Sequence, residues 1–275
     1  MTRSERCGAA HGPTWREILC AGAVALLACG CPGAAVKRTY PPPSAARLVR
    51  HVSDVTARAR SLRAETRSDV RIGKERANVT VLIMARWGGK LRFMAMNPND
   101  TEAADLAADG ARYAFIDYKN NCGDAGPATP ENVARLIRIV MEPDDVVRLL
   151  FGSTPVLGGA AGTVAWDEDG GHEVLALAAG GFTQRIVLDG RERRWDVLES
   201  EVKAPDGKRV WRVRHKDFHP VKRPDGSTLR LPGKSYFEQQ GDTLLIRWRE
   251  QELDLELGDE KFQMELPPGL PICGG

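Results

Sequence analysis

The sequence predicts an α+β fold, in which an antiparallel sheet is combined with a few helices. Most of the chain alternates polar and apolar residues in short segments, separated by turn pairs such as Gly88-Gly89, Asp109-Gly110 and Asp189-Gly190. Apolar residues recur every three or four positions in one stretch ahead of the strands and in two consecutive stretches mid-chain. Strands that follow one another through short turns pair as antiparallel neighbours, so the helical stretches interrupt a meander.

The chain begins with a segment typical of a secretory signal. Arg3, Arg6 and Arg16 precede a small and apolar run at 18–28. A basic segment, a short apolar run and small residues before a cleavage site describe a signal peptide. The run is too short to cross a bilayer, which takes about 20 apolar residues. We therefore expect residues 1–28 to be a signal peptide. The residue that follows it, Cys29, indicates a lipoprotein signal peptide.

A cysteine comes directly after this run. The segment Leu26-Leu27-Ala28-Cys29 resembles a bacterial lipobox, in which a peptidase cuts before a cysteine that carries a thioether-linked lipid. The resemblance implies lipidation of Cys29, with Cys31 as the alternative, and a membrane partner bound through this anchor. A chance cysteine in an ordinary signal peptide or in a buried helix is the competing interpretation.

The residue after the cysteine bears on location. By resemblance to enterobacterial sorting rules, an aspartate there retains a lipoprotein in the inner membrane, and Gly30 follows Cys29 here. The expected location is therefore the outer membrane, with the domain facing the periplasm. The inner membrane and the cell surface stay open as alternatives.

The segment after the anchor is Pro-rich, and a helix follows it. Residues 29–43 are expected to comprise the lipidated N-terminus and, at 32–43, a Pro-rich tether that is extended and does not pack. Ser44 then serves as the N-cap of a helix that runs to about Arg63. Its apolar residues recur at spacings of three and four: Leu48, Val52, Val55, Ala59 and Leu62.

The remaining helices and strands are predicted from the periodicity of apolar residues and from turn residues. Thr129 caps a helix that starts at Pro130, and Pro143 starts a second helix that Gly152 ends. The domain is expected to span 44–270, with 271–275 as a tail. Strands are expected at 65–73, 76–87, 90–97, 101–109, 111–118, 162–168, 172–179, 182–189, 194–201, 208–217, 235–239, 242–250, 252–257 and 261–266.

Two of these strands are apolar on both faces, at 79–84 and 174–179. An antiparallel strand with one wet face should alternate. Such a strand is therefore either covered on both sides, which is the default expectation, or has one side lining an apolar cavity.

Composition excludes several classes of function. The net charge is only +2, with 39 basic and 37 acidic residues interspersed, so nucleic-acid binding is not expected. No CxxC or His/Cys cluster has metal-ligand spacing, so no metal and no cofactor are expected. Of six cysteines, Cys122 and Cys273 remain in the folded part, where they either pair in an oxidising compartment or stay as free thiols.

Three segments carry a resemblance to a known family. They are 105–115 (DLAADGARYAF), 142–152 (EPDDVVRLLFG) and 261–269 (KFQMELPPG), in this order. They are similar to the LolA/LolB-like superfamily of periplasmic lipoprotein carriers and outer-membrane receptors, and especially to a lipoprotein branch of unknown function within it. The resemblance covers 44–270 and implies an incomplete antiparallel β-barrel, or half-barrel, covered by α-helices.

The resemblance also implies a ligand. A half-barrel under helices leaves a cavity for acyl chains of lipids or lipoproteins, with a role in lipoprotein localisation or outer-membrane lipid handling. These side chains either line such a cavity or fill a packed core. The candidates for its wall are Val81, Ile83, Leu91, Phe93, Met94, Leu136, Ile137, Val140, Leu149, Leu150 and Phe151.

Other functions have less support. No Gly-x-Ser-x-Gly, Walker loop or His-Glu-x-x-His motif occurs, so an enzyme is not expected. The alternative to lipid binding is a non-catalytic structural or assembly lipoprotein that docks a partner in the cell envelope.

Overall fold

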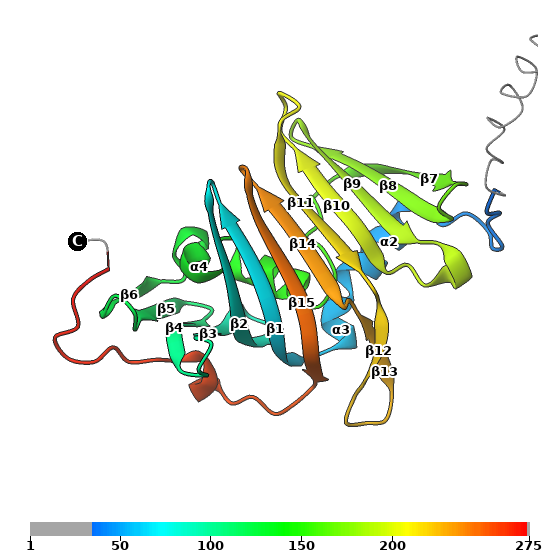
Figure 1. Ribbon diagram of the computed structural model, residues 1–275. Coiled ribbons are helices and arrows are strands. Elements are labelled where there is room, and N and C mark those ends of the chain that lie inside the picture. Colours follow the sequence, from blue (N-terminus) through cyan, green and yellow to red (C-terminus); the bar gives the residue numbers. More distant parts are fainter. Residues whose placement is uncertain (1–34, 274–275) are drawn as a thin grey trace, which may run out of the picture. The chain divides into compact units, whose positions relative to one another are not determined.

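Thirteen strands form one antiparallel sheet in the computed structural model, which describes residues 35–273 (Figure 1). The strands of the first half are β1 Ser61–Ile72, β2 Glu75–Arg86, β3 Lys90–Met96, β4 Glu102–Asp109, β5 Arg112–Asp117 and β6 Cys122–Pro127. Those of the second half are β7 Ala161–Asp167, β8 His172–Ala179, β9 Phe182–Asp189, β10 Val197–Lys203, β11 Arg209–Lys216, β14 Lys234–Gln239 and β15 Asp242–Leu253. A separate hairpin consists of β12 His219–Lys222 and β13 Thr228–Leu231.

The sheet is open. Its spatial order is β6-β5-β4-β3-β2-β1-β15-β14-β11-β10-β9-β8-β7, so the long strands β1 and β15 join the two meanders. Strands β6 and β7 lie at opposite ends of this order, and the sheet does not close between them. The predicted α+β class and the incomplete barrel covered by helices are confirmed.

Helices cover one face of the sheet (Figure 1). They are α2 Ala45–Ser53, α3 Val55–Arg58, α4 Pro130–Ile137 and α5 Pro143–Leu150. Helix α2 contacts β7, α4 contacts β4, and α5 contacts β2 and β3. We call the covered side the inner face and the opposite side the outer face.

Two apolar cores lie on the inner face. The larger one joins both meanders and holds the apolar sides of α4 and α5 against β1–β5, β11, β14 and β15. The smaller one packs Leu48 and Val52 of α2 against Leu175, Ile186 and other residues of β8–β10. The two helices expected after Thr129 and Pro143 are present, and both supply buried residues to the larger core.

The helix expected to extend to Arg63 is shorter than predicted. It ends in two pieces at Arg58, and β1 begins at Ser61. The helix-like spacing of apolar residues continues beyond the end of the helix because the larger core buries Val55, Ala59 and Leu62 alike. Leu62, however, pairs with Leu253 and Ala85 in the sheet, so burial continues while the backbone has changed to a strand.

Several strand predictions also need correction. Strands β6, β12 and β13 were missed, and residues 242–253 form one strand rather than two. The expected last strand at 261–266 is replaced by a 3-10 turn, η2 Asp259–Phe262, and an extended segment. The alternation of Phe262, Met264 and Leu266 remains because these residues pack on the sheet without pairing with it.

The Pro-rich segment, expected not to pack, is extended but packed from Val36 onward. The backbone N–H of Val36 donates to the carbonyl of Glu168 at 2.7 Å. Arg38 forms an ion pair at 2.8 Å with Glu173, whose side chain is fully buried, and the Tyr40 hydroxyl donates to the same carboxylate at 3.0 Å. Contacts of aromatic and charged side chains thus attach the segment to the sheet, although its proline content had predicted an unpacked tether.

The C-terminal residues 258–273, which we call the strap, cross the outer face of β3 and β4. Asp105 on this face is almost fully buried and pairs with Arg92, which also donates to the carbonyl of Lys261. A disulfide joins Cys122 to Cys273 with 5.0 Å between the Cα atoms. The two cysteines left open by the sequence therefore fasten the strap to the end of the sheet.

Candidate functional site

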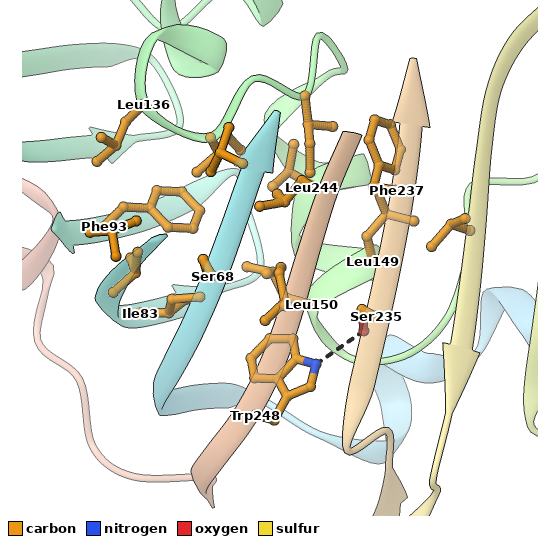
Figure 2. A pocket seen from close by; sticks show the side chains of 18 of the residues that line it. Ser68, Ile83, Phe93, Leu136, Leu149, Leu150, Ser235, Phe237, Leu244 and Trp248 are labelled. Atoms are coloured by element: carbon orange, nitrogen blue, oxygen red, sulfur yellow. Dashed lines mark hydrogen bonds between the residues drawn. The ribbon is translucent and has the colours of Figure 1, made fainter. Parts of the chain in front are cut away.

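An apolar cavity lies between the inner face and the lid, by which we mean residues 130–150 (α4, the connecting loop and α5) (Figure 2). The sheet contributes Ser68, Val70, Val79, Val81, Ile83, Phe93, Ala95, Val213, His215, Ser235, Phe237, Leu244, Ile246 and Trp248. The lid contributes Leu136, Ile137, Ile139, Val146, Leu149 and Leu150.

The cavity is narrow. Its volume is about 60 Å³, where one water needs about 10–15 Å³ in the same measure. It therefore has room for a few atoms but not for a whole acyl chain. The lining residues Val70, Val79 and Leu136 are half-buried, and they mark the side on which the cavity approaches solvent.

Local sequence explains the position of the lid. The Thr129 hydroxyl accepts from the Asn132 N–H, and Pro130 starts α4 where an N–H would lack a partner. Asp144 in the first turn of α5 accepts from the N–H groups of Gly88 and Gly89, at 2.9 and 2.8 Å. Both Gly88 and Gly89 have positive φ, which suits glycine in this tight turn.

Two further polar contacts fasten the lid to the sheet. Arg135 of α4 pairs with Asp124 of β6 at 2.5 Å. The side chain of Gln239, at the end of β14, bonds the backbone of Val140 in the connecting loop. Arg138, in the same loop, has φ 58°, where α4 ends in a left-handed residue.

A polar group lies among the apolar residues of the sheet wall. The Trp248 indole N–H donates to the Ser235 hydroxyl at 3.0 Å, and His215 Nδ1 contacts the same hydroxyl at 2.9 Å (Figure 2 shows the Trp248 bond). His215 Nε2 lies 3.2 Å from the carbonyl oxygen of Ser153. Complete burial lowers the pKa of His215 to about 4, so its imidazole is neutral at neutral pH.

The structure brings together seven of the eleven predicted wall residues. Those that line the cavity are Val81, Ile83, Phe93, Leu136, Ile137, Leu149 and Leu150. The strand at 79–84 thus has one side on the cavity, while Leu82 and Met84 on the outer face are half-buried. The default expectation that this strand is covered on both sides is wrong.

Four predicted wall residues lie elsewhere. Met94 is in β3 between the inward-facing Phe93 and Ala95, so it points to the outer face. Val140 is 40% exposed on the lid loop. Leu91 and Phe151 are buried in the larger core away from the cavity, and Phe151 stacks on Trp87 with ring centroids 5.2 Å apart.

The sequence interpretation missed the contribution of the second meander. Strands β11, β14 and β15 supply about half of the sheet wall, and Ser68 on β1 was missed as well. The alternation of Leu244, Ile246 and Trp248 marked an inward-facing row. Only the pairing of β1 with β15 shows that this row lies opposite the lid.

Other kinds of site find no support in the described residues. Within 35–273 no group of three or more His, Cys, Asp or Glu side chains is placed to hold a metal ion. No helix in this part of the chain has the length and apolar character needed to span a bilayer. Residues 1–34, with the proposed lipidation sites Cys29 and Cys31, lie outside the described part.

Comparison with solved structures identifies the fold. A LolA superfamily protein from Nitrosomonas europaea superposes with a TM-score of 0.55 at 10% identity, over 81% of this chain and 99% of that one. The fold is LolA-like. A DUF1329 family protein from Desulfovibrio piger also matches this LolA-like fold, with a TM-score of 0.50 at 11% identity over 80% and 95% of the two chains.

A putative outer membrane lipoprotein-sorting protein domain from Vibrio parahaemolyticus gives a TM-score of 0.49 at 11% identity, over 80% and 95% of the chains. No family model matches the sequence, and no curated protein matches it either. The LolA-like fold is established by the two matches with TM-scores of 0.55 and 0.50, and not by sequence.

Proposed function

We propose that this protein binds an acyl chain of a lipid or lipoprotein between the inner face of its sheet and the lid. The observation that carries this proposal is an apolar cavity, lined by both meanders, beneath a lid in a LolA-like fold. Burial of each methylene contributes about 0.8 kcal/mol. A dry wall of aliphatic and aromatic side chains is the environment that such a chain requires.

Binding of a whole chain requires the lid to move. The closed cavity holds only about 60 Å³, so a ligand has to displace lid residues such as Ile139, Leu149 or Leu150. The described polar contacts that oppose this motion are few, and the one at Gln239 is exposed to solvent. Burial of several methylenes exceeds the loss of a few exposed hydrogen bonds, each of which contributes about 0.5–1.5 kcal/mol.

The test is fluorescence titration of residues 36–275, which form a compact unit, with cis-parinaric acid. We expect saturable binding that Ala95→Phe weakens at least fivefold, because the ring occupies the cavity. The matched control is Ala176→Phe on the exposed surface of β8, which should bind like the wild type. Equal binding by both variants would contradict the proposal.

The proposal includes a lipid anchor in the outer membrane. Val36, the first packed residue, comes seven positions after Cys29, and an extended chain of this length reaches at most about 25 Å. An anchor at Cys29 therefore keeps the domain close to the bilayer surface. Labelled palmitate should enter the wild type and the Cys31→Ser variant but not Cys29→Ser, and labelling of all three would contradict this assignment.

We infer no catalytic role for the cavity. Ser235 and His215 are in contact, but acyl transfer also needs hydrogen-bond donors for the developing oxyanion. The Trp248 N–H already donates to Ser235, and His215 Nε2 faces a carbonyl. Within the described residues, the side chains of the cavity thus leave no donor for this task.

A second candidate function is structural: an envelope lipoprotein that docks a partner while its own side chains fill the interior. The small cavity volume favours it. Native mass spectrometry of protein isolated from membranes separates the two functions. A copurifying acyl species supports the lipid binder, whereas a ligand-free protein in complex with a partner supports the structural role.

A further inference from the structure

The polar atoms of the cavity lie in one row across the sheet. Ser68 pairs with Ile246 in the β1–β15 ladder, Ile246 pairs with Ser235, and Ser235 pairs with His215. All four residues line the cavity, and Trp248 lies next to this row on β15. These are the described lining residues with polar side-chain atoms: Ser68, His215, Ser235 and Trp248.

The hydrogen-bonding role of Ser235 follows from its neighbours. A carbonyl oxygen only accepts, so His215 Nε2 carries the proton that it shares with the Ser153 carbonyl. In the neutral ring, Nδ1 is then an acceptor, and the Ser235 hydroxyl must donate to it. The Trp248 N–H can only donate, so Ser235 accepts that bond. One lone pair of Ser235 is left over.

The hydroxyl proton of Ser68 is also used in a hydrogen bond within the protein. Thr66 donates its hydroxyl proton to the carbonyl of Val81, at 3.1 Å. The bond of 3.2 Å between Thr66 and Ser68 therefore uses the proton of Ser68, which leaves the lone pairs of Ser68 without a donor. Both serines are almost fully buried on the cavity wall, and Figure 2 shows them on the two sides of strand β15.

The cavity side chains therefore present acceptors and no free donor to a ligand. We propose that the cavity prefers an acyl chain that carries a hydroxyl group over the same chain without one, with Ser68 and Ser235 as the acceptors. This inference rests on the proposed acyl-chain binding and names the chemical class of its ligand. A carboxylate or phosphate is an acceptor itself, so it finds no partner among these side chains and stays outside.

The expected preference is modest and specific. A hydroxyl that reaches Ser68 or Ser235 gains one hydrogen bond, which corresponds to about a three- to tenfold tighter complex. Without the acceptors, the same hydroxyl would be buried with no partner, which disfavours binding. Removal of the acceptors should therefore abolish or reverse the preference rather than weaken all ligands equally.

The experiment measures displacement of cis-parinaric acid from residues 36–275 by stearate and by 3-, 10- and 12-hydroxystearate. At least one hydroxystearate should bind about three- to tenfold more tightly than stearate. The preference should disappear in the Ser68→Ala, Ser235→Ala double variant. Ser200→Ala, which removes a buried serine of β10 outside the cavity, is the matched control and should keep the preference.

Loss of Ser235 leaves His215 Nδ1 and the Trp248 indole N–H without partners, so the double variant is checked by circular dichroism. If it does not fold, Ser68→Ala decides, because Thr66 keeps its bond to Val81 in that variant, and the preference should then fall at least twofold. If every hydroxystearate binds as well as stearate or more weakly, or if the preference is unchanged in the folded variant, the inference about the hydroxyl group is wrong. The proposed acyl-chain binding would still stand. If neither stearate nor any hydroxystearate binds, the proposed function fails with it.

Discussion

Gln239 bonds both polar backbone groups of Val140. Its side-chain carbonyl accepts from the Val140 N–H at 2.9 Å, and its amide group donates to the Val140 carbonyl at 3.1 Å. These residues are 99 positions apart in sequence, and they join the lid loop to the end of strand β14. The paired bonds hold the lid closed at a solvent-exposed point.

Gln239→Leu should therefore speed exchange of ligand. Leucine has a similar size but makes neither bond, so the lid opens more readily, whereas stability should fall by less than about 1 kcal/mol because both bonds are exposed. Stopped-flow fluorescence with cis-parinaric acid measures entry, which we expect to be several-fold faster. Gln263→Leu on the exposed strap is the control. Identical entry rates for all three proteins would show that this contact does not restrain the lid.

The packed tether depends on one buried carboxylate. Arg38→Leu should destabilise the domain by about 3–5 kcal/mol, because it leaves the carboxylate of Glu173 buried without its cation. The double variant Arg38→Leu, Glu173→Leu should recover most of this loss, since no charge remains buried. Urea denaturation checks both. If the single and the double variant are equally unstable, the loss is due to packing rather than to the ion pair.

The disulfide should contribute substantially to stability. Cys122 and Cys273 are 151 positions apart, and a crosslink over so long a loop stabilises a domain by about 2–4 kcal/mol. Cys122→Ser with Cys273→Ser should lower the free energy of unfolding by this amount and make the strap more sensitive to protease. Addition of dithiothreitol should affect the wild type but not the double variant; an equal effect on both would exclude this role.

Stability should fall in mild acid because of His215. Its pKa is about 4 in the folded state and about 6.5 when unfolded, so only the unfolded chain takes up a proton between these values. This contribution is constant above pH 6.5, falls by about 3 kcal/mol as the pH drops to 4, and is constant below. Burial lowers the pKa of His51 in the same direction.

The measurement is the free energy of unfolding between pH 4 and 7. His215→Asn should show a shallower decline with falling pH than the wild type, although it is less stable at pH 7. The exposed His219→Asn serves as control and should follow the wild-type curve. Parallel curves for His215→Asn and the wild type would show that this imidazole does not govern the acid response.

Local pattern predicted most of the fold but only part of the site. The turn glycines that bound the segments at 90–97 and 182–189 reflect local chemistry, and these strands are where they were expected. Strand β6, with the sequence CGDAGP, has almost no β-forming residues and is held by pairing with β5 and by the disulfide. Such tertiary effects leave no local signal.

The cavity wall was harder to predict for the same reason. The strands at 79–84 and 90–96 both have apolar residues on their two faces, so sequence alone did not separate the inward-facing Val81 and Ile83 from the outward-facing Met94. Ser68, Ser235 and His215 look like ordinary polar residues in sequence. They belong to the cavity only because β1, β15, β14 and β11 are neighbours in the sheet.

The central claim is that an acyl chain lies between the sheet and the lid, and photo-crosslinking tests it most directly. A fatty acid with a diazirine near its chain end is bound to the protein, illuminated, and its adducts are mapped by mass spectrometry, with excess unlabelled stearate as competitor. We expect competable adducts within 79–96 and 136–150, which contain the wall and lid residues. Adducts confined to the outer face, for example at Tyr236 or Leu245, would contradict the account.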